Sequence, residues 1–116
     1  MSKPLGPYTP VVRAGDFIII SGQGGLLDGI KVDGGVVPET AQAMKNIESL
    51  LATMGATMDD VVKTTCFLTD MEDYARFNAA YVAAFGNHRP SRSCVAVAEL
   101  PAAFVVEVEA WAYKPV

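Results

Sequence analysis

Residues 104–113, with the sequence FVVEVEAWAY, decide the fold of this chain. Their side chains alternate between two faces with the period of two that defines a β-strand. One face holds only small and aliphatic residues, and the other combines two carboxylates with large apolar side chains. The first face comprises Val106, Val108, Ala110 and Ala112, and the second comprises Val105, Glu107, Glu109, Trp111 and Tyr113. Both faces of this strand are therefore expected to be covered.

Working outward from this strand, turn signals and hydrophobic spacing predict further strands and two helices. Strands are expected over residues 11–13, 17–21, 61–69 and 92–100, with a loop and a short strand over residues 22–36. A helix is predicted from Pro38 to a stop at Gly55, on the helical spacing of Ala43, Met44, Ile47, Leu50, Leu51 and Met54. Thr57 and Asp60 are spaced to cap the turn that follows. The order is strands, helix, strand, helix and two strands.

The second helix begins at Asp70 and Asp73 and ends at Gly86. Its apolar stripe comprises Tyr74, Phe77, Tyr81, Val82 and Phe85. Two helices can cover only one face of a sheet of about five or six strands, which predicts an α+β fold with one sheet face left open. A second copy of the chain is the simplest cover for that face, so we expect a homo-oligomer. The alternative is a two-layer monomer with an unusually apolar surface.

The composition of the 116 residues indicates one globular domain spanning residues 1–116, since 51% are hydrophobic and 19% are charged. A net charge of −4 disfavours a nucleic-acid or anionic-membrane surface. No apolar run approaches the length of a membrane span, and Met1–Pro4 lacks a signal-peptide pattern, so a cytoplasmic protein is expected. Two cysteines are too few for a disulfide scaffold or a zinc site.

Candidate chemistry starts from an arginine, because the common catalytic sets are missing. The single histidine, His88, lies in a loop without an obvious partner and is expected to be solvated. Arg92 and Cys94 lie on one face of a predicted strand, and the arginine fork suits a carboxylate ligand. An ion pair of Arg92 with Glu99, Glu107 or Glu109 is the alternative.

Other polar residues lie in apolar surroundings. Glu107 shares a strand face with Glu109, and it is either a carboxylate with a raised pKa that acts as a base or part of a solvated face. Asn78 lies four residues after Tyr74 in the second helix, where it either anchors a loop or reaches a ligand. Cys94 is interpreted as a packing residue, because no histidine is available to activate it. Tyr8 and Ser21 stand beside glycines in turns.

Taken in order, these segments resemble the RidA family (reactive intermediate imine deaminase, also called the YjgF family). The resemblance rests on Gly6-Pro7-Tyr8, Ser21-Gly22-Gln23, Asn46-Ile47, Asp60-Val61-Val62-Lys63-Thr64-Thr65, Phe77-Asn78-Ala79-Ala80-Tyr81, Pro90-Ser91-Arg92-Ser93-Cys94-Val95, Leu100-Pro101 and Val106-Glu107-Val108-Glu109. It covers nearly the whole chain, and the arginine-serine-cysteine-valine segment is its most diagnostic part.

The resemblance implies a chorismate-mutase-like two-layer fold, with a mixed sheet, two helices on one face, and a homotrimer whose sheets pack inward. It also implies sites between subunits that hydrolyse amino-acid-derived enamines and imines, such as 2-iminobutanoate and 2-iminopropanoate, to 2-keto acids and ammonia, without a cofactor. The family's site residues match Tyr8, Ser21, Asn78, Arg92, Cys94 and Glu107. In that scheme Arg92 holds the substrate carboxylate, Glu107 activates water, the Cys94 backbone adds a polar contact, and the other three residues shape the pocket.

Two other functions fit the same residues. One is a non-catalytic trimeric binding module for small carboxylates, and the other is a pathway-specific deaminase of pyrimidine or aromatic-amine catabolism. Nuclease activity, attached to some family members, is disfavoured by the acidic charge. Ser91, Phe104 and Trp111 depart from the family pattern, so the aromatic residues either favour a bulkier imine or repack the trimer.

Overall fold

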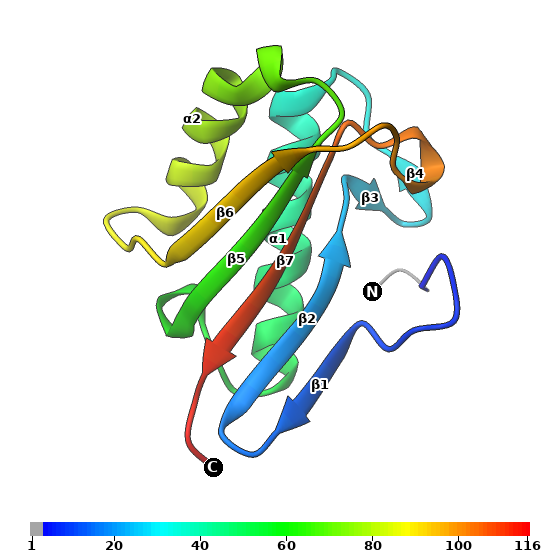
Figure 1. Ribbon diagram of the computed structural model, residues 1–116. Coiled ribbons are helices and arrows are strands. Elements are labelled where there is room, and N and C mark those ends of the chain that lie inside the picture. Colours follow the sequence, from blue (N-terminus) through cyan, green and yellow to red (C-terminus); the bar gives the residue numbers. More distant parts are fainter. Residues whose placement is uncertain (1–3) are drawn as a thin grey trace.

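A five-stranded sheet with two helices on one face organises the protein, whose computed structural model describes residues 4–116 (Figure 1). The strands are β1 (Val11–Ala14), β2 (Phe17–Gln23), β3 (Leu26–Leu27), β4 (Ile30–Lys31), β5 (Val61–Leu68), β6 (Ser91–Ala96) and β7 (Val106–Tyr113). The helices are α1 (Val36–Thr53) and α2 (Tyr74–Phe85), with short 3-10 helices η1 (Met58–Asp60), η2 (Met71–Asp73) and η3 (Pro101–Ala103). The predicted α+β class and element order are confirmed.

The sheet has the strand order β1-β2-β7-β5-β6, and β3 and β4 form a separate hairpin. Neighbouring strands are antiparallel except β5 and β6, which run parallel and are connected through α2. Two parallel strands need a crossover connection. Here α2 forms this connection and packs on the same face of the sheet as α1. Figure 1 shows both helices behind the sheet, with β6 at one edge and β1 at the other. The mixed sheet expected from the family resemblance is confirmed.

The core lies between the sheet and the helices, because one face of β7 is wholly apolar and one face of α1 is mostly apolar. The predicted inner residues of β7 are buried, as are five of the six residues that predicted α1. These five are Ala43, Met44, Ile47, Leu50 and Leu51. No helix within residues 4–116 is both long enough and apolar enough to cross a lipid bilayer.

The opposite face of the sheet carries exposed aromatic side chains. Phe17 makes edge-to-face contacts with Trp111 and Tyr113, with ring centroids 6.0 Å and 5.3 Å apart. Trp111 is 42% exposed, which is high for a residue of this size in a central strand. A single chain therefore leaves this apolar face of the sheet uncovered, which is the feature from which the sequence predicts an oligomer.

The predicted limits of three elements are wrong. The strand expected over residues 92–100 ends at Ala96, and β7 begins at Val106 rather than at residue 104. Between them Ala102 and Ala103 have a φ of 57°, a conformation that a strand cannot continue through. Helix α1 begins at Val36, before Pro38, because proline is tolerated in the first turn of a helix.

Two expectations about side-chain exposure also need correction. Phe77, Tyr81 and Phe85 are buried as predicted for α2, but Tyr74 and Val82 are 40% and 38% exposed. The prediction that His88 is solvated, made from its position in a loop, is wrong. Its Nε2 lies 2.7 Å from the Val61 carbonyl oxygen, and its ring packs against Phe85, so it fastens the loop after α2 to β5.

Candidate functional site

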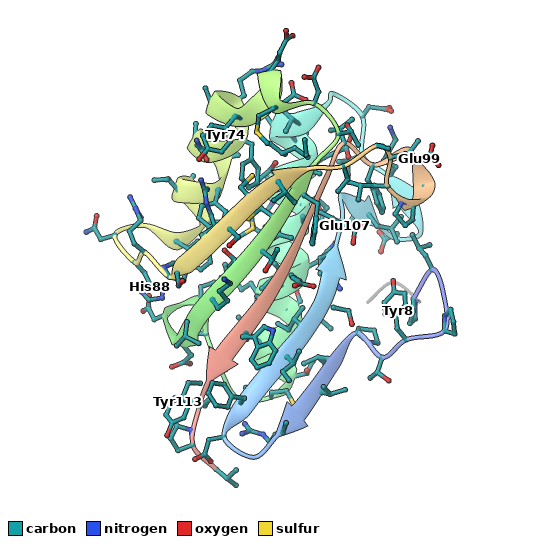
Figure 2. The ribbon with its side chains drawn as sticks, viewed as in Figure 1. Tyr8, Tyr74, His88, Glu99, Glu107 and Tyr113 are labelled. Carbon is teal, nitrogen blue, oxygen red and sulfur yellow. The ribbon has the colours of Figure 1, made fainter. Side chains whose placement is uncertain are left out.

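The six residues proposed from the sequence fall into two groups on opposite faces of the sheet. Arg92 is in register with the buried Thr64 of β5, so its side chain points toward the helices. Glu107 is in register with Phe67 of the same strand and points away from the helices. The first group comprises Asn78, Arg92 and Cys94, and the second comprises Tyr8, Ser21 and Glu107. Figure 2 shows Tyr74, a neighbour of the first group, on the side of α2, well apart from Tyr8.

The guanidinium of Arg92 is held by four side chains of α2, Tyr74, Phe77, Asn78 and Tyr81, which we call the Arg92 cage. Nη1 donates a hydrogen bond to Asn78 Oδ1 and Nη2 donates one to the Tyr74 hydroxyl oxygen, both at 2.9 Å. Arg92 Cζ lies 5.6 Å, 5.6 Å and 4.9 Å from the ring centroids of Tyr74, Phe77 and Tyr81. The cage residues share one helical face, and their rings attract the cation.

The Arg92 cage contains no acid. Within residues 4–116, Arg92 forms no ion pair, so the alternative of a pair with Glu99, Glu107 or Glu109 is wrong for the single chain. The register explains this for Glu107 and Glu109, which lie on the other face of the sheet. A guanidinium has five N–H donors, and the cage engages two of them. The positive charge is therefore oriented and left without a counter-ion.

The second group of residues lines a cleft of about 770 Å³, which we call the Glu107 cleft. The cleft lies between the N-terminal segment, the end of β2 and helix α1, and its lining is mixed polar and apolar. Its side chains include Leu5, Tyr8, Ser21, Gln23, Leu26, Leu27, Asn46, Leu50, Phe104 and Glu107. In Figure 2 the labelled Tyr8 and Glu107 lie on two sides of the end of β2. A pocket of this size accommodates a small organic acid with room to spare.

A β-bulge places Gly22 directly against the Glu107 carboxylate. Ile20 pairs with Ala110 and Gln23 with Val108, so two residues of β2, Ser21 and Gly22, lie opposite Glu109 alone. A Cβ on Gly22 would lie 2.2 Å from Glu107 Oε1, so no other residue fits without displacing the carboxylate. Burial, and secondly the charge of Glu109, raise the pKa of Glu107 above its ordinary value. Such a carboxylate is a stronger base than a solvated one.

Ser21 fixes the N-terminal wall of the Glu107 cleft. Its Oγ donates to the Thr9 carbonyl oxygen at 2.8 Å, and its amide donates to the Pro10 carbonyl oxygen at 2.9 Å. The hydroxyl oxygen of Tyr8 accepts a hydrogen bond from the Leu5 amide at 3.2 Å. These bonds hold the segment that carries Tyr8 against the end of β2.

The two cysteines lie side by side in β5 and β6 as free thiols. Burial raises the pKa of Cys66 to about 12 and also raises the pKa of Cys94, although the Arg92 charge acts in the opposite direction at both. Protonated thiols are poor nucleophiles, which favours the packing interpretation of Cys94. In the described part of the chain, no group of three His, Cys, Asp or Glu side chains is arranged to hold a metal ion.

Sequence reasoning missed Tyr74 and Gly22 as individual members of the site. The hydrophobic spacing predicts that Tyr74 belongs to the apolar stripe of the second helix, although its spacing of four residues from Asn78 also places these two residues on one helical face. Gly22 was only part of the resemblance, and its contact with Glu107 depends on a bulge that no local pattern indicates.

Together the fold and these two groups define a class: a small α+β domain with an oriented arginine, a desolvated carboxylate and an open cleft, suited to binding a small anionic molecule. The family model described as "Endoribonuclease L-PSP" matches residues 1–114. The chain belongs to this family, which is the RidA/YjgF family that the sequence resembles.

Alignments with related proteins cover nearly the whole chain. A RutC family protein from Pyrococcus horikoshii is 40% identical over 114 residues, which covers 97% of this chain and 90% of that protein. The 2-iminobutanoate/2-iminopropanoate deaminase of Mus musculus is 43% identical over 112 residues, covering 95% and 83%. A crystal structure from Thermotoga maritima superimposes with a TM-score of 0.93 at 39% identity, covering 98% of this chain and 91% of that one.

Proposed function

We propose that this protein hydrolyses amino-acid-derived 2-imino acids to 2-keto acids and ammonia. The observation that carries the proposal is the Arg92 guanidinium, which Asn78 and Tyr74 orient without any acidic partner in the described chain. A planar fork with free N–H donors is complementary to the carboxylate of such a substrate. The 43% identity to a mouse protein named as this kind of deaminase supports the assignment, while the family also has members with other names.

The proposed site is shared between two copies of the chain. Arg92 and Glu107 lie on opposite faces of one sheet, so a single chain does not bring them to one small substrate. We place the Arg92 cage of one subunit against the Glu107 cleft of its neighbour, in a homotrimer whose sheets pack inward. The exposed aromatic face of the sheet is the surface that this assembly covers.

The chemistry needs a positioned water and a base. Arg92 binds the substrate carboxylate, with Asn78 fixing the guanidinium. Glu107 takes a proton from water as the water oxygen attacks the carbon of the protonated imine, whose C=N π electrons move to nitrogen, and a neutral carbinolamine forms. Glu107 then returns this proton to the nitrogen, and the C–N bond breaks with its electron pair leaving on ammonia. The carboxylate of Glu107 takes the hydroxyl proton as the C=O bond forms. Tyr8 and Ser21 shape the cleft, and the Cys94 backbone on edge strand β6 adds a polar contact to the carboxylate.

The direct test measures keto-acid formation from an imine generated by an amino-acid oxidase, with semicarbazide competing for the imine. Arg92→Ala is expected to lower the accelerated rate by about a hundredfold or more, because the substrate loses its anchor. Arg76→Ala is the matched control, since Arg76 carries the same charge on the exposed face of α2 and, within residues 4–116, forms an ion pair with Asp73 alone. An unchanged rate in Arg92→Ala would contradict the proposal.

A second variant separates an enzyme from a binding module. Glu107→Gln preserves the shape of the cleft but cannot accept a proton at neutral pH. It is expected to bind 2-oxobutanoate in calorimetry and to lose turnover. If the wild-type protein binds 2-oxobutanoate but accelerates no imine hydrolysis, the protein is a carboxylate-binding module instead.

RNA cleavage is a weaker candidate despite the description of the family model. The net charge is −4, and binding of nucleic acid depends on positive charge that neutralises phosphates. A basic surface of that kind is not evident from nine Lys and Arg against thirteen Asp and Glu.

A further inference from the structure

One member of the Arg92 cage, Tyr74, combines a ring contact with a hydrogen bond to the arginine and is also exposed. Tyr74 is the first residue of α2 and is 40% exposed, unlike the buried Phe77 and Tyr81 beneath the same guanidinium. Its hydroxyl oxygen accepts from Arg92 Nη2 at 2.9 Å, and its ring centroid lies 5.6 Å from Cζ. A residue that both bonds and flanks the cation constrains its orientation in two ways.

The placement of Tyr74 is itself well defined by the local sequence. Asp70 accepts a hydrogen bond from the Glu72 amide at 2.9 Å and so caps the 3-10 turn that leads into α2. This turn delivers Tyr74 one helical turn before Asn78, on the same face. Tyr74 and Asn78 therefore engage different nitrogens of one guanidinium, Nη2 and Nη1. Together they fix both its position and the rotation of its plane.

We propose that Tyr74 is a positioning residue for Arg92, and that its hydroxyl preorganises the guanidinium to receive the ligand carboxylate. The proposal rests on the proposed function, since it assumes that Arg92 binds a carboxylate. Without the hydroxyl, Arg92 keeps its aromatic contacts and its bond to Asn78 but gains freedom to swing away. The ligand must then restore the lost order when it binds, which weakens binding.

Arg76 provides a control outside the Arg92 cage, since it is exposed on α2 and forms an ion pair with Asp73. Tyr81 provides a comparison within the cage. Its ring lies closest to the cation, 4.9 Å from Cζ, but its hydroxyl bonds to Thr64 Oγ1 at 2.7 Å in the buried interior. Tyr81→Phe therefore removes a hydroxyl from the cage without removing a hydrogen bond to Arg92. A loss of stability is expected there, because the buried Thr64 hydroxyl loses its partner.

The experiment measures the Kd of 2-oxobutanoate by calorimetry and the KM and kcat of imine hydrolysis for Tyr74→Phe, Tyr81→Phe and Arg76→Ala. Tyr74→Phe is expected to raise Kd and KM about fivefold, as for the ordering of one long side chain, with a smaller change in kcat. Arg76→Ala, outside the cage, is expected to leave Kd and KM within twofold of wild type. Tyr81→Phe is expected to lower the melting temperature and to raise Kd less than Tyr74→Phe does. An effect of Tyr74→Phe on Kd no larger than that of Arg76→Ala or Tyr81→Phe would overturn the proposal.

A double-variant comparison tests whether Tyr74 acts through Arg92. In an Arg92→Lys background the planar fork is gone, so adding Tyr74→Phe is expected to change Kd by less than twofold. The same fivefold loss in that background would mean that Tyr74 acts independently of Arg92, which also overturns the proposal. If Arg92→Ala leaves binding and turnover unchanged, the proposed function itself fails. If Arg92→Ala loses binding and turnover but Tyr74→Phe behaves like the wild type, only the role of Tyr74 is rejected.

Discussion

The Arg92 cage and the Glu107 cleft surround a charged side chain near the apolar core in opposite ways. Arg92 is enclosed by side chains of one helix that satisfy and flank the cation, and its charge stays oriented. Glu107 sits on the open face of the sheet against a glycine, partly desolvated and beside a second carboxylate. The first arrangement favours binding of an anion, and the second favours uptake of a proton. The difference fits the proposed division of labour, with Arg92 as the anchor and Glu107 as the base.

The largest effect on the rate of imine hydrolysis is expected when the Arg92 cage and the Glu107 cleft are inactivated in different subunits. Arg92→Ala and Glu107→Ala homo-oligomers should each lose about a hundredfold or more of the imine hydrolysis rate. After subunit exchange in an equal mixture, activity should return to about one quarter of wild type, because in any closed ring one neighbour pair in four then combines an intact Arg92 with an intact Glu107.

The control for this mixture is Arg92→Ala with the Arg92→Ala, Glu107→Ala double variant, which supplies no intact arginine and should stay inactive. Keto-acid formation and a native mass spectrum of the mixture check both rate and exchange. Exchanged oligomers without recovered activity would show that the two regions do not share a site.

Two glycines of the Glu107 cleft are expected to separate activity from stability. Ala at position 22 would place a Cβ 2.2 Å from Glu107 Oε1, the movable end of a side chain, so activity should fall about tenfold or more with little change in unfolding. Ala at position 24 would place a Cβ 2.4 Å from the ring of the buried Phe104, which should lower the unfolding free energy by about 1–3 kcal/mol.

Urea denaturation and imine kinetics on Gly22→Ala and Gly24→Ala measure these two effects side by side. A Gly22→Ala protein with the wild-type rate would mean that the position of the Glu107 carboxylate does not matter for turnover.

The smallest effect is expected at Glu109, which perturbs Glu107 only through its charge. Glu107 must be ionised to take a proton from water, so the rate should fall as the pH drops through the pKa of Glu107. Because the Glu109 charge helps to raise that pKa, Glu109→Gln should move the acid limb of the kcat/KM profile to lower pH. Glu99→Gln removes the same charge from an exposed loop and should leave the limb in place. An upward shift in Glu109→Gln would contradict the assignment of Glu107 as the base.

The element order and the inner face of the sheet could be predicted because they depend on local periodicity. The alternation in residues 104–113 and the helical spacing from Ala43 to Leu51 each require only neighbouring residues. The strand limit at Ala96 could not be predicted, since Ala102 and Ala103 give no signal of a positive φ. The burial of Tyr74 was predicted wrongly because a tyrosine fits an apolar stripe and a polar contact equally well.

The candidate site was only partly within reach of sequence reasoning. The identities of Arg92 and Glu107 could be selected as polar residues in apolar strands. Their separation onto opposite faces follows from the registers that pair Arg92 with Thr64 and Glu107 with Phe67 of β5, and register between distant strands is long-range pairing that no local pattern encodes. The bulge that brings Gly22 to Glu107 depends on the same pairing.

The parallel pairing of β5 and β6 has a consequence for how the protein folds. The contacts that hold Arg92 join residues 14 and 18 positions apart, within a single strand-helix-strand unit. The Glu107 cleft instead joins residues from both ends of the chain, including Tyr8 and Phe104. Short loops close at a lower entropic cost than long ones, so the arginine side of the molecule can organise before the chain ends meet. We therefore expect the surroundings of Arg92 to form early, from local structure, and those of Glu107 to form only when folding is complete.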